Sequence, residues 1–332
     1  MNKKRKVNVL TYLTLIYIYV LYENINLAKS NLNNKQRLTL AGASFPSAFY
    51  RKVLYKQYKE GGPKVTYQAV GSGFGLKALM SKTIDIAASD DPIDFTKYEK
   101  KDILQFPIIG GNIVIGYNKT DCNLKLSQKD LVKLANGEIS NWNYFNCKKG
   151  PITWVYRSDA SGTTKSFARS LTKFSEEWKL GIGKSIMWQS GIGSKGNAGV
   201  ATRIKLTEGS IGYLNQSFVK YPIQTAAIQN KAGEYIYPTK YSGELTLEDI
   251  NLDKNLSGFN PNPIKKGSYP LSYLTWILVY KDSLYSSKSS AIKITINNLL
   301  SKKSQQLAQE LGYVPLTYKI IKLSKSKLDE FK

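Results

Sequence analysis

Three times in this 332-residue chain, a strand-like run ends in small or hydroxyl residues and is followed at once by a helix-like run. Strands that alternate with helices predict an α/β fold, and a chain of this length has ample residues for its core. Behind the third junction, Phe167, Leu171 and Phe174 recur at helical spacing. The junctions are Ala41-Gly42-Ala43-Ser44-Phe45-Pro46, Gly71-Ser72-Gly73-Phe74-Gly75 and Arg157-Ser158-Asp159-Ala160-Ser161-Gly162-Thr163-Thr164.

These junctions have the chemistry of an anion site. The first turn of a helix exposes unpaired N–H groups, and the helix dipole favours negative charge there. The third junction adds the guanidinium of Arg157 and the hydroxyls of Ser161 and Thr163. An ordinary N-cap serine beside a turn glycine explains any single junction equally well. Three junctions in one chain favour a shared site for an oxyanion.

The chain is strongly basic, with 48 Lys and Arg against 24 Asp and Glu, a net charge of +24. Such a balance suggests nucleic-acid binding as one interpretation. Only six of these residues are Arg, and the lysines are scattered rather than clustered beside aromatic residues. We therefore expect a solvated basic surface that attracts anions at long range, and no nucleic-acid partner.

The sequence contains no His. This excludes Ser-His-Asp and Cys-His catalysis, His-ligated metals and a His-based pH switch. We expect no catalytic residue, no metal ion and no cofactor, although carboxylate-based or Lys-based chemistry is not excluded by this observation.

The N-terminus has the pattern of an export signal. Lys3-Lys4-Arg5-Lys6 is a basic stretch, and Val7 to Leu21 is an apolar run that is short for a membrane span. Ala28 and Ser30 are the small residues available for cleavage. We expect residues 1–30 to be a cleaved signal peptide and the mature protein to be periplasmic. An uncleaved anchor is the alternative, because a clear cleavage motif is missing.

Cys122 and Cys147 are the two cysteines of the chain. In an exported protein an isolated pair favours one disulfide. On chain-entropy grounds this bond would stabilise the fold by about 3 kcal/mol. Two free buried thiols are the alternative, because the sequence does not give the separation of the two Cα atoms.

Other elements follow from the same patterns. Ser127 and Asp130 resemble a capping box at a helix start. The apolar spacing from Ile292 predicts a long helix, with an extension toward Leu311. The stretch 229–263 is polar and rich in Gly and Pro, so we expect a surface loop there. Strands are expected at 84–88, 112–117, 210–214 and 275–280.

Taken together, short motifs between about residues 38 and 320 resemble the periplasmic phosphate-binding proteins of bacterial Pst-type ABC transporters, in order and in spacing. The motifs are Gly42-Ala43-Ser44-Phe45-Pro46, Tyr67-Gln68-Ala69-Val70-Gly71-Ser72-Gly73, Ala88-Ser89-Asp90 with Asp91-Pro92, Gln105-Phe106-Pro107 with Gly110-Gly111, Arg157 to Thr163, and Gly193-Ser194-Lys195-Gly196-Asn197.

The resemblance implies a type II periplasmic-binding-protein fold, in which two α/β lobes are joined by two crossing segments and the ligand lies in the cleft. Carried over, lobe 1 is 36–108 plus 269–332, and lobe 2 is 109–268. The implied function is a high-affinity receptor, not an enzyme, that delivers inorganic phosphate to the membrane permease of an ABC importer. We expect the receptor to be a monomer.

The resemblance also implies a set of phosphate ligands. Asp159 is expected to hold Arg157 in orientation rather than to contact the anion. The implied ligands are the hydroxyls of Ser44, Ser72, Ser161 and Thr163, the guanidinium of Arg157, the carboxylate of Asp90, and the backbone N–H groups of Phe45, Gly162 and Thr163.

Asp90 carries the selectivity in this scheme. A carboxylate repels an anion unless the anion still has a hydrogen to donate, as phosphate does near neutral pH and sulfate does not. Asp90 is therefore expected to accept a hydrogen bond from phosphate and to exclude sulfate. Without the resemblance, a turn Asp before Asp91-Pro92 is the simpler interpretation.

Two further classes stay open as alternatives. One is an exported phosphatase or phosphotransferase on the same scaffold, which requires a nucleophile, an in-line water or a metal. The other is a basic nucleic-acid-binding or adhesion protein, whose binding falls steeply with salt.

Overall fold

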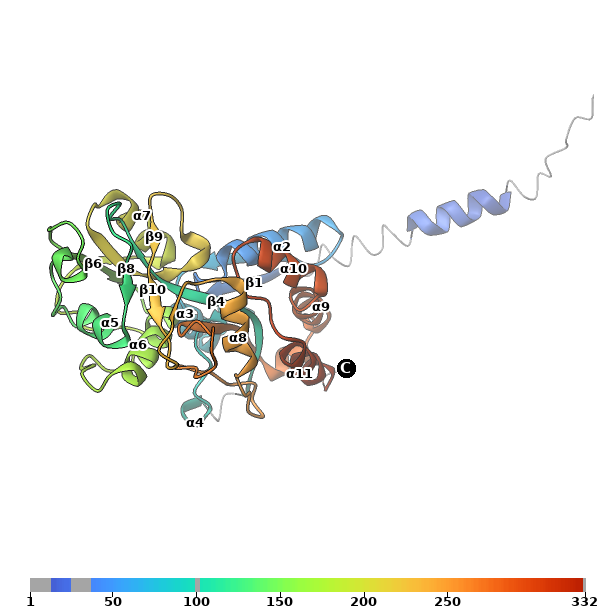
Figure 1. Ribbon diagram of the computed structural model, residues 1–332. Helices are drawn as coiled ribbons and strands as arrows, with labels where there is room; N and C mark the ends of the chain where they lie inside the picture. Colours follow the sequence, from blue (N-terminus) through green and yellow to red (C-terminus); the bar gives the residue numbers. More distant parts are fainter. Residues whose placement is uncertain (1–12, 25–36, 99–101, 331–332) are drawn as a thin grey trace, which may run out of the picture.

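The computed structural model describes residues 13–24, 37–98 and 102–330 (Figure 1). The body is built on a nine-stranded sheet with the order β2-β1-β3-β12-β4-β8-β6-β7, in which β9 pairs with β4. A three-stranded sheet has the order β11-β10-β5. The strands are β1 (Arg37–Gly42), β2 (Lys64–Ala69), β3 (Ile86–Ser89), β4 (Ile103–Tyr117), β5 (Lys125–Leu126), β6 (Thr153–Arg157), β7 (Ile192–Ser194), β8 (Ser210–Asn215), β9 (Gln224–Thr225), β10 (Ala227–Gln229), β11 (Tyr235–Ile236) and β12 (Ser272–Tyr280).

Helices pack on the large sheet along its whole width (Figure 1). α2 lies against β2, α3 against β1 and β3, and α7 against β6 and β8. The α-helices are α2 (Ser47–Lys59), α3 (Ser72–Met80), α4 (Phe95–Tyr98), α5 (Gln128–Ala135), α6 (Gly162–Phe174), α7 (Gly196–Leu206), α8 (Lys240–Glu248), α9 (Ser289–Leu299), α10 (Lys302–Glu310) and α11 (Tyr318–Asp329), and the 3-10 helices are η2 (Trp142–Phe145), η3 (Gln216–Phe218) and η4 (Lys281–Leu284).

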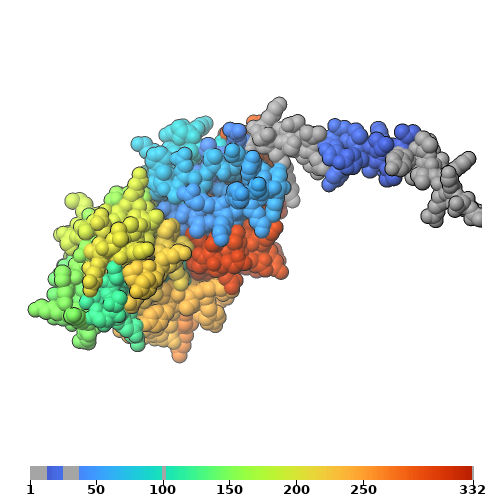
Figure 2. All heavy atoms as spheres, turned by 90° about the horizontal axis from the view of Figure 1, so that it is seen from above, coloured from blue at the N-terminus to red at the C-terminus, as the bar shows by residue number. Residues whose placement is uncertain are grey.

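The 15-residue strand β4 joins two lobes. Its residues 103–112 pair antiparallel with β12, and its residues 113–117 pair with β8. We call the first lobe the part built on β1, β2, β3, β12 and the start of β4, and the second lobe the part built on β6, β7, β8, β9 and the end of β4. Figure 2 shows the blue and red atoms, from the two ends of the chain, grouped on one side of the body, and the green and yellow atoms of its middle grouped on the other. The predicted two-lobed α/β fold is confirmed.

In the second lobe, neighbouring side chains of one strand enter the core on opposite faces of the sheet. Val155 of β6 packs with Val200 and Ile204 of α7. The preceding residue, Trp154, stacks on Phe167 of α6, with the two ring centres 6.4 Å apart. Successive side chains of a strand point to opposite faces, so a strand covered by helices on both sides is apolar throughout.

The helix starts predicted from the sequence are confirmed. α2 begins at Ser47, directly behind the first junction, and α3 and α6 begin at Ser72 and Gly162, within the second and third junctions. Ser127 caps α5, because its side chain accepts a hydrogen bond from the backbone N–H of Asp130 at 3.0 Å.

The extension of the predicted long helix toward Leu311 is a separate helix. α9 ends at Leu299, and α10 begins at Lys302. Ser301 breaks the run because its side chain caps the new helix, accepting from the backbone N–H of Ser304 at 3.1 Å. The apolar spacing continues across this break, which is why the spacing alone did not reveal it.

The prediction of a surface loop over 229–263 was wrong for part of this stretch. This stretch contains α8, which packs against β4 and β12. Leu247, Ile250 and Leu256 are 0%, 2% and 5% exposed. The indole N–H of Trp276, in the first lobe, donates to the carbonyl of Leu256 at 2.9 Å. Composition was misleading here because a few buried apolar residues are spaced among many polar ones.

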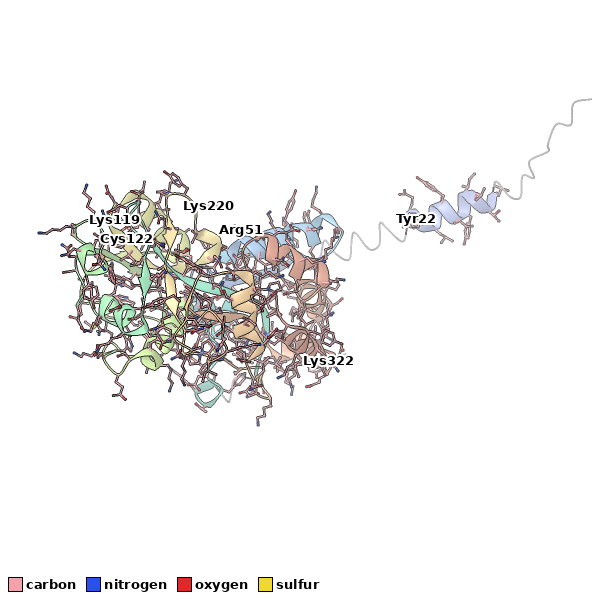
Figure 3. All side chains as sticks on the ribbon, in the orientation of Figure 1. Tyr22, Arg51, Lys119, Cys122, Lys220 and Lys322 are labelled. Atoms are coloured by element: carbon pink, nitrogen blue, oxygen red, sulfur yellow. A yellow bond between two sulfur atoms is a disulfide. The ribbon has the colours of Figure 1, made fainter. Side chains whose placement is uncertain are left out.

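Residues 13–24 form a helix that stands apart from the body, with Tyr22 labelled in Figure 3. Its large apolar side chains are exposed, among them Leu13 and Ile16. Within the described ranges, no helix is both long enough and apolar enough to cross a membrane. The rest of the predicted signal peptide, residues 1–12 and 25–30, lies outside the described residues.

Cys122 and Cys147 are joined by a disulfide, with their Cα atoms 5.2 Å apart. The bond closes a loop that contains α5 and η2. Figure 3 shows Cys122 on the side of the second lobe that faces away from the first.

Candidate functional site

The three junctions meet between the two lobes. β1 pairs in parallel with both β2 and β3, so the carboxyl ends of these strands lie at one edge of the first lobe. Ser44 follows β1, Ser72 follows β2 and Asp90 follows β3. Arg157 ends β6 in the second lobe, shortly before α6 begins. Open α/β sheets bind ligands beyond the carboxyl ends of their strands, which makes this region the candidate site.

Side chains of the two lobes bond directly here. The Ser44 Oγ accepts from the backbone N–H and from the side-chain amide of Asn197, both at 3.1 Å. The Thr163 hydroxyl donates to Asp90 Oδ2 at 3.0 Å. Ser44 and Asp90 are 5% and 4% exposed. The lobes are therefore closed on each other at the candidate site.

Two glycines permit this close approach. The backbone N–H of Gly73 donates to the carbonyl of Ala160, in the other lobe, at 2.8 Å. A Cβ placed on Gly162 would lie 2.5 Å from the Ser72 Oγ, so a side chain does not fit at this position. The same Oγ of Ser72 accepts from the backbone N–H of Asp90 at 3.2 Å.

Asp159 orients the guanidinium of Arg157. The Nε of Arg157 donates to Oδ1 of Asp159 at 2.6 Å, and its Nη2 donates to Oδ2 at 2.5 Å. Asp159 Oδ1 also accepts from the backbone N–H of Gly196 at 2.9 Å. Burial opposes ionisation of Asp159, but the hydrogen bond and the charge of Arg157 keep its pKa below the usual value. The remaining nitrogen of Arg157, Nη1, lies 3.4 Å from the Thr163 hydroxyl.

Asp90 is a buried acceptor held by two hydroxyls. Thr163 donates to one carboxylate oxygen and Thr275 of β12 to the other, both at 3.0 Å. Burial raises the pKa of Asp90 to about 6, although the hydrogen bond of Thr275 and the charge of Arg157 act in the opposite direction. Near neutral pH the carboxylate is therefore ionised, and it attracts any further hydrogen-bond donor that enters the site.

Ser161 is the N-cap of α6. Its Oγ accepts from the backbone N–H of Thr164 at 3.1 Å, which leaves its hydroxyl hydrogen for another partner. In the first lobe, the carbonyls on either side of Ser44 are held by tyrosines. Tyr67 donates to the carbonyl of Ala43, and Tyr313 donates to that of Phe45 at 2.9 Å. These bonds hold the two peptides that flank the one carrying the N–H of Phe45.

Three further residues of this network were not predicted from the sequence. Asn197 ends one of the six motifs, but no role was assigned to it. Thr275 is a hydroxyl residue inside the apolar strand β12, and this isolated polar residue was the available signal. Tyr213 of β8 gave no signal, yet its hydroxyl accepts from the backbone N–H of Arg157 at 3.2 Å and lies 2.7 Å from the Thr164 hydroxyl.

The assembled groups suit an oxyanion that still carries a hydrogen. Hydroxyls, backbone N–H groups and one guanidinium supply donors, and the carboxylate of Asp90 supplies an acceptor. Within the described part of the chain, no group of three or more Cys, Asp or Glu side chains is placed to hold a metal ion.

Comparison with known sequences agrees with this geometry. Residues 29–295 match the PBP superfamily domain, so the fold and the site define a member of that superfamily. The phosphate-binding protein PstS of Haemophilus influenzae is 33% identical, over 87% of this chain and 92% of its own length. PstS of Pasteurella multocida is 35% identical, over 86% and 88% of the two chains. The chain belongs to the PstS family of phosphate-binding proteins.

Solved structures show the same fold. A high-affinity periplasmic phosphate-binding protein, solved with phosphate bound, superposes with a TM-score of 0.73 over 87% of this chain and 93% of its own, at 19% identity. An ABC-type phosphate transport receptor from Vibrio cholerae superposes with a TM-score of 0.58 over 83% and 99% of the two chains, at 18% identity.

Proposed function

We propose that this protein is the extracytoplasmic receptor that binds inorganic phosphate and delivers it to the permease of an ABC importer. The observation that carries the proposal is the pairing of a buried acceptor with a buried guanidinium where the lobes meet. Asp90 and Arg157 are each 4% exposed and come from opposite lobes. The names of the relatives support the same ligand and the same transport role. A binding protein of this kind carries out no catalysis.

We propose the following roles for the residues of the site. Arg157 binds two phosphate oxygens or neutralises their charge, while Asp159 positions it. The hydroxyls and amides complete the coordination, because each is a donor beside the interlobe contact. This proposed ligand set is Ser44, Phe45, Ser72, Asp90, Arg157, Ser161, Gly162 and Thr163.

Selectivity follows from the acceptor. Phosphate near neutral pH always carries a hydrogen, and Asp90 accepts it. Sulfate has no hydrogen to offer, so its oxygen would face an ionised carboxylate in a region from which water is excluded. Such repulsion between like charges is strong at low local dielectric. Sulfate is thereby rejected although its size and shape are similar.

Calorimetry of the mature protein with phosphate, sulfate and arsenate tests the function. We expect phosphate to bind tightly and sulfate not to bind measurably. Asp90→Ala is expected to lose phosphate affinity and to gain measurable sulfate binding. Asp90→Asn is expected to keep partial phosphate binding, because its amide either donates or accepts. If both variants keep wild-type phosphate affinity and still exclude sulfate, the proposed selectivity is wrong.

We also propose the lobe boundaries 36–108 plus 269–332 for lobe 1 and 109–268 for lobe 2. The change of partner along β4, from β12 to β8 after Asn112, supports a crossing close to the first boundary. The packing of α8 against β4 and β12 argues that part of 240–258 moves with lobe 1. Hydrogen exchange with and without phosphate tests this division.

Residues 1–30 are proposed to be removed on export, which leaves a periplasmic monomer with no affinity for nucleic acid. The start of the superfamily match at residue 29 supports this cleavage region. Gel filtration of the mature chain tests the monomer. A titration with duplex DNA at low salt tests the absence of nucleic-acid binding, since non-specific DNA affinity is largest there.

A further inference from the structure

A second carboxylate, Asp91, stands directly beside Asp90 but faces different partners. Its Oδ1 lies 2.6 Å from the Nη2 of Arg169, and its Oδ2 lies 2.8 Å from the Nζ of Lys165. The Asp91 side chain is only 2% exposed. Ser89 holds the turn, because its hydroxyl donates to the carbonyl of Asp91 at 2.6 Å.

Both ion pairs cross from one lobe to the other. Asp91 follows β3 in the first lobe, while Lys165 and Arg169 belong to α6 in the second. The two cations are one helical turn apart, so they lie on one face of α6 and reach the same carboxylate. The first turn of α6 carries Gly162 and Thr163 of the proposed phosphate site. Parting the lobes at that site therefore breaks both ion pairs.

Arg169 is held in place for this contact. Its guanidinium lies over the ring of Phe259, 4.1 Å from the ring centre. Its Nη1 is buried and has no hydrogen-bond partner among the described residues, so Asp91 is its principal polar contact. A planar guanidinium that is already stacked on an aromatic ring loses little freedom when it forms an ion pair.

Solvent reaches the Lys165 end of these ion pairs but not the proposed ligand side chains. A cavity of about 400 Å³ is bordered by Asp91, Lys165 and Lys184. Lys165 is 28% exposed, whereas Ser72, Asp90 and the other named ligand side chains are at most 5% exposed. A bound anion therefore has no way out until the lobes separate.

We propose that Asp91, Lys165 and Arg169 form a latch that holds the two lobes closed over the bound anion and sets the rate of its release. The inference rests on the proposed function, because it requires an anion held between the lobes. The three residues are positioning residues: they stabilise the closed arrangement without touching the ligand. Hinge closure around a ligand is the usual motion of such two-lobed receptors.

Release and affinity are measured separately to test the latch. Tryptophan fluorescence in a stopped-flow instrument follows phosphate release, and calorimetry gives affinity. Arg169→Gln is expected to speed release about tenfold, the loss typical of one charged hydrogen bond. Lys165→Gln is expected to speed it about threefold, because that pair is more exposed. Association rate and the preference for phosphate over sulfate should not change.

Lys173→Gln is the matched control. Lys173 lies on the same helix, is exposed, and loses the same charge in this variant, but it makes no ion pair with any residue that the structure describes. Its release rate should equal that of the wild type. Thermal unfolding of every variant establishes that it is folded.

Asp91→Asn separates the latch from simple attraction of the anion by two cations. Attraction alone predicts tighter phosphate binding when the neighbouring negative charge is removed, whereas the latch predicts weaker binding and faster release. Adding Arg169→Gln to Asp91→Asn should then cost little more, because both changes remove the same pair. The latch is overturned if Asp91→Asn and Arg169→Gln each release phosphate at the wild-type rate. It is also overturned if their effects on the release rate add in the double variant.

Failure of the proposed function gives a different result. If the wild-type protein releases no heat with phosphate, the function is wrong. The latch is then judged by small-angle scattering of the ligand-free protein at low salt. The double variant Asp91→Asn with Arg169→Gln should have the larger radius of gyration, and equal radii would refute the latch.

Discussion

Asp90 and Asp91 are neighbours with opposite surroundings. Asp91 is neutralised by two cations from the other lobe, whereas among the described residues the Asp90 carboxylate receives hydrogen bonds from the neutral hydroxyls of Thr163 and Thr275. A buried carboxylate without a direct ion pair is costly to ionise. The charge of Asp90 is thus kept available for the ligand at the expense of the stability of the ligand-free protein.

The first prediction concerns pH and this cost. The pKa of Asp90 is raised from 3.8 to about 6 in the folded protein. A raised carboxyl pKa contributes stability that is fully present below about pH 4 and is lost as pH rises through about 6. Asp90→Asn should therefore stabilise the ligand-free protein by about 2 kcal/mol at pH 7.5 and by much less at pH 4. Urea unfolding of phosphate-free protein at both pH values measures this.

Asp94→Asn is the control for that measurement. The hydroxyl of Thr96 and backbone N–H groups lower the pKa of Asp94, the opposite direction. Removing its charge should not stabilise the protein at pH 7.5. If Asp90→Asn, like Asp94→Asn, does not raise the free energy of unfolding at pH 7.5, then burial does not make the ionised Asp90 carboxylate destabilising.

The second prediction concerns Arg157. Arg157→Ala should weaken phosphate binding by at least about 2 kcal/mol, through loss of charge-assisted bonds to a desolvated anion. The loss is increased because Asp159 then keeps a negative charge beside the anion without the guanidinium that neutralises it. Arg157→Lys should recover only part, since a lysine does not pair with Asp159 and the anion at once in the same plane. Calorimetry measures both, with the exposed Arg203→Ala as control, and unchanged affinity in Arg157→Ala would place the anion elsewhere.

Part of this candidate site was predictable because hydroxyls, glycines and a guanidinium at helix starts have a direct chemical meaning, whereas Asp90 was proposed only through the family resemblance. What was not predictable is which groups meet across the cleft. Ser44 and Asn197 are far apart in sequence, as are Asp90 and Thr275, and nothing local specifies either pair. Such contacts depend on how two lobes close, which is a property of the whole fold.

At the scale of elements, local capping chemistry was the most reliable guide. The start of α5 followed from Ser127 and Asp130, and the start of α6 followed from the third junction. α8 was missed because only one of its buried residues, Leu247, has a large apolar side chain. Its capping box, Thr239 with Ser242, was the signal that composition obscured. Tertiary burial, not local periodicity, gives that helix its stability.

The third prediction concerns the loop closed by Cys122 and Cys147. Replacing both with Ser should lower the free energy of unfolding by about 3 kcal/mol, because the unfolded chain gains freedom. Phosphate affinity should change little, since the bond lies on the outer side of the second lobe (Figure 3). Denaturant titration measures the stability, and reduced wild-type protein should match the double variant. Alkylation of both cysteines in denatured, non-reduced protein would show that the bond is not formed in the mature protein.

At the scale of the molecule, alternating strands and helices led from the sequence to an α/β fold but not to two lobes. The first lobe combines strands from both ends of the chain, and pattern along the sequence does not reveal a discontinuous unit. The two-lobed arrangement was predicted from the resemblance of the motifs. In the structure it is seen where β4 stops pairing with β12 and begins pairing with β8.

The fourth prediction concerns export. The mature chain should begin near residues 29–31, because the superfamily match starts at 29 and the first strand at Arg37. Leu15→Asp with Ile16→Asp should block export, since charges in the apolar run disrupt its recognition as a signal. N-terminal sequencing of native protein, and the mass of the variant, measure these outcomes. Native protein that still begins at Met1 would contradict cleavage.

The position of β12 has a consequence for how the chain acquires its binding site. β12 is inserted between β3 and β4, antiparallel to both, although it comes from residues 272–280. β6, β7 and β8 of the second lobe, by contrast, lie within the continuous stretch 153–215. In a chain that emerges from its N-terminus, β12 is synthesised long after β3. The edge of β3 that pairs with β12 therefore stays unpaired until then, and pairings between distant segments also form slowly. The same strand brings Thr275 to Asp90, so closing the sheet and assembling the acceptor are one folding event.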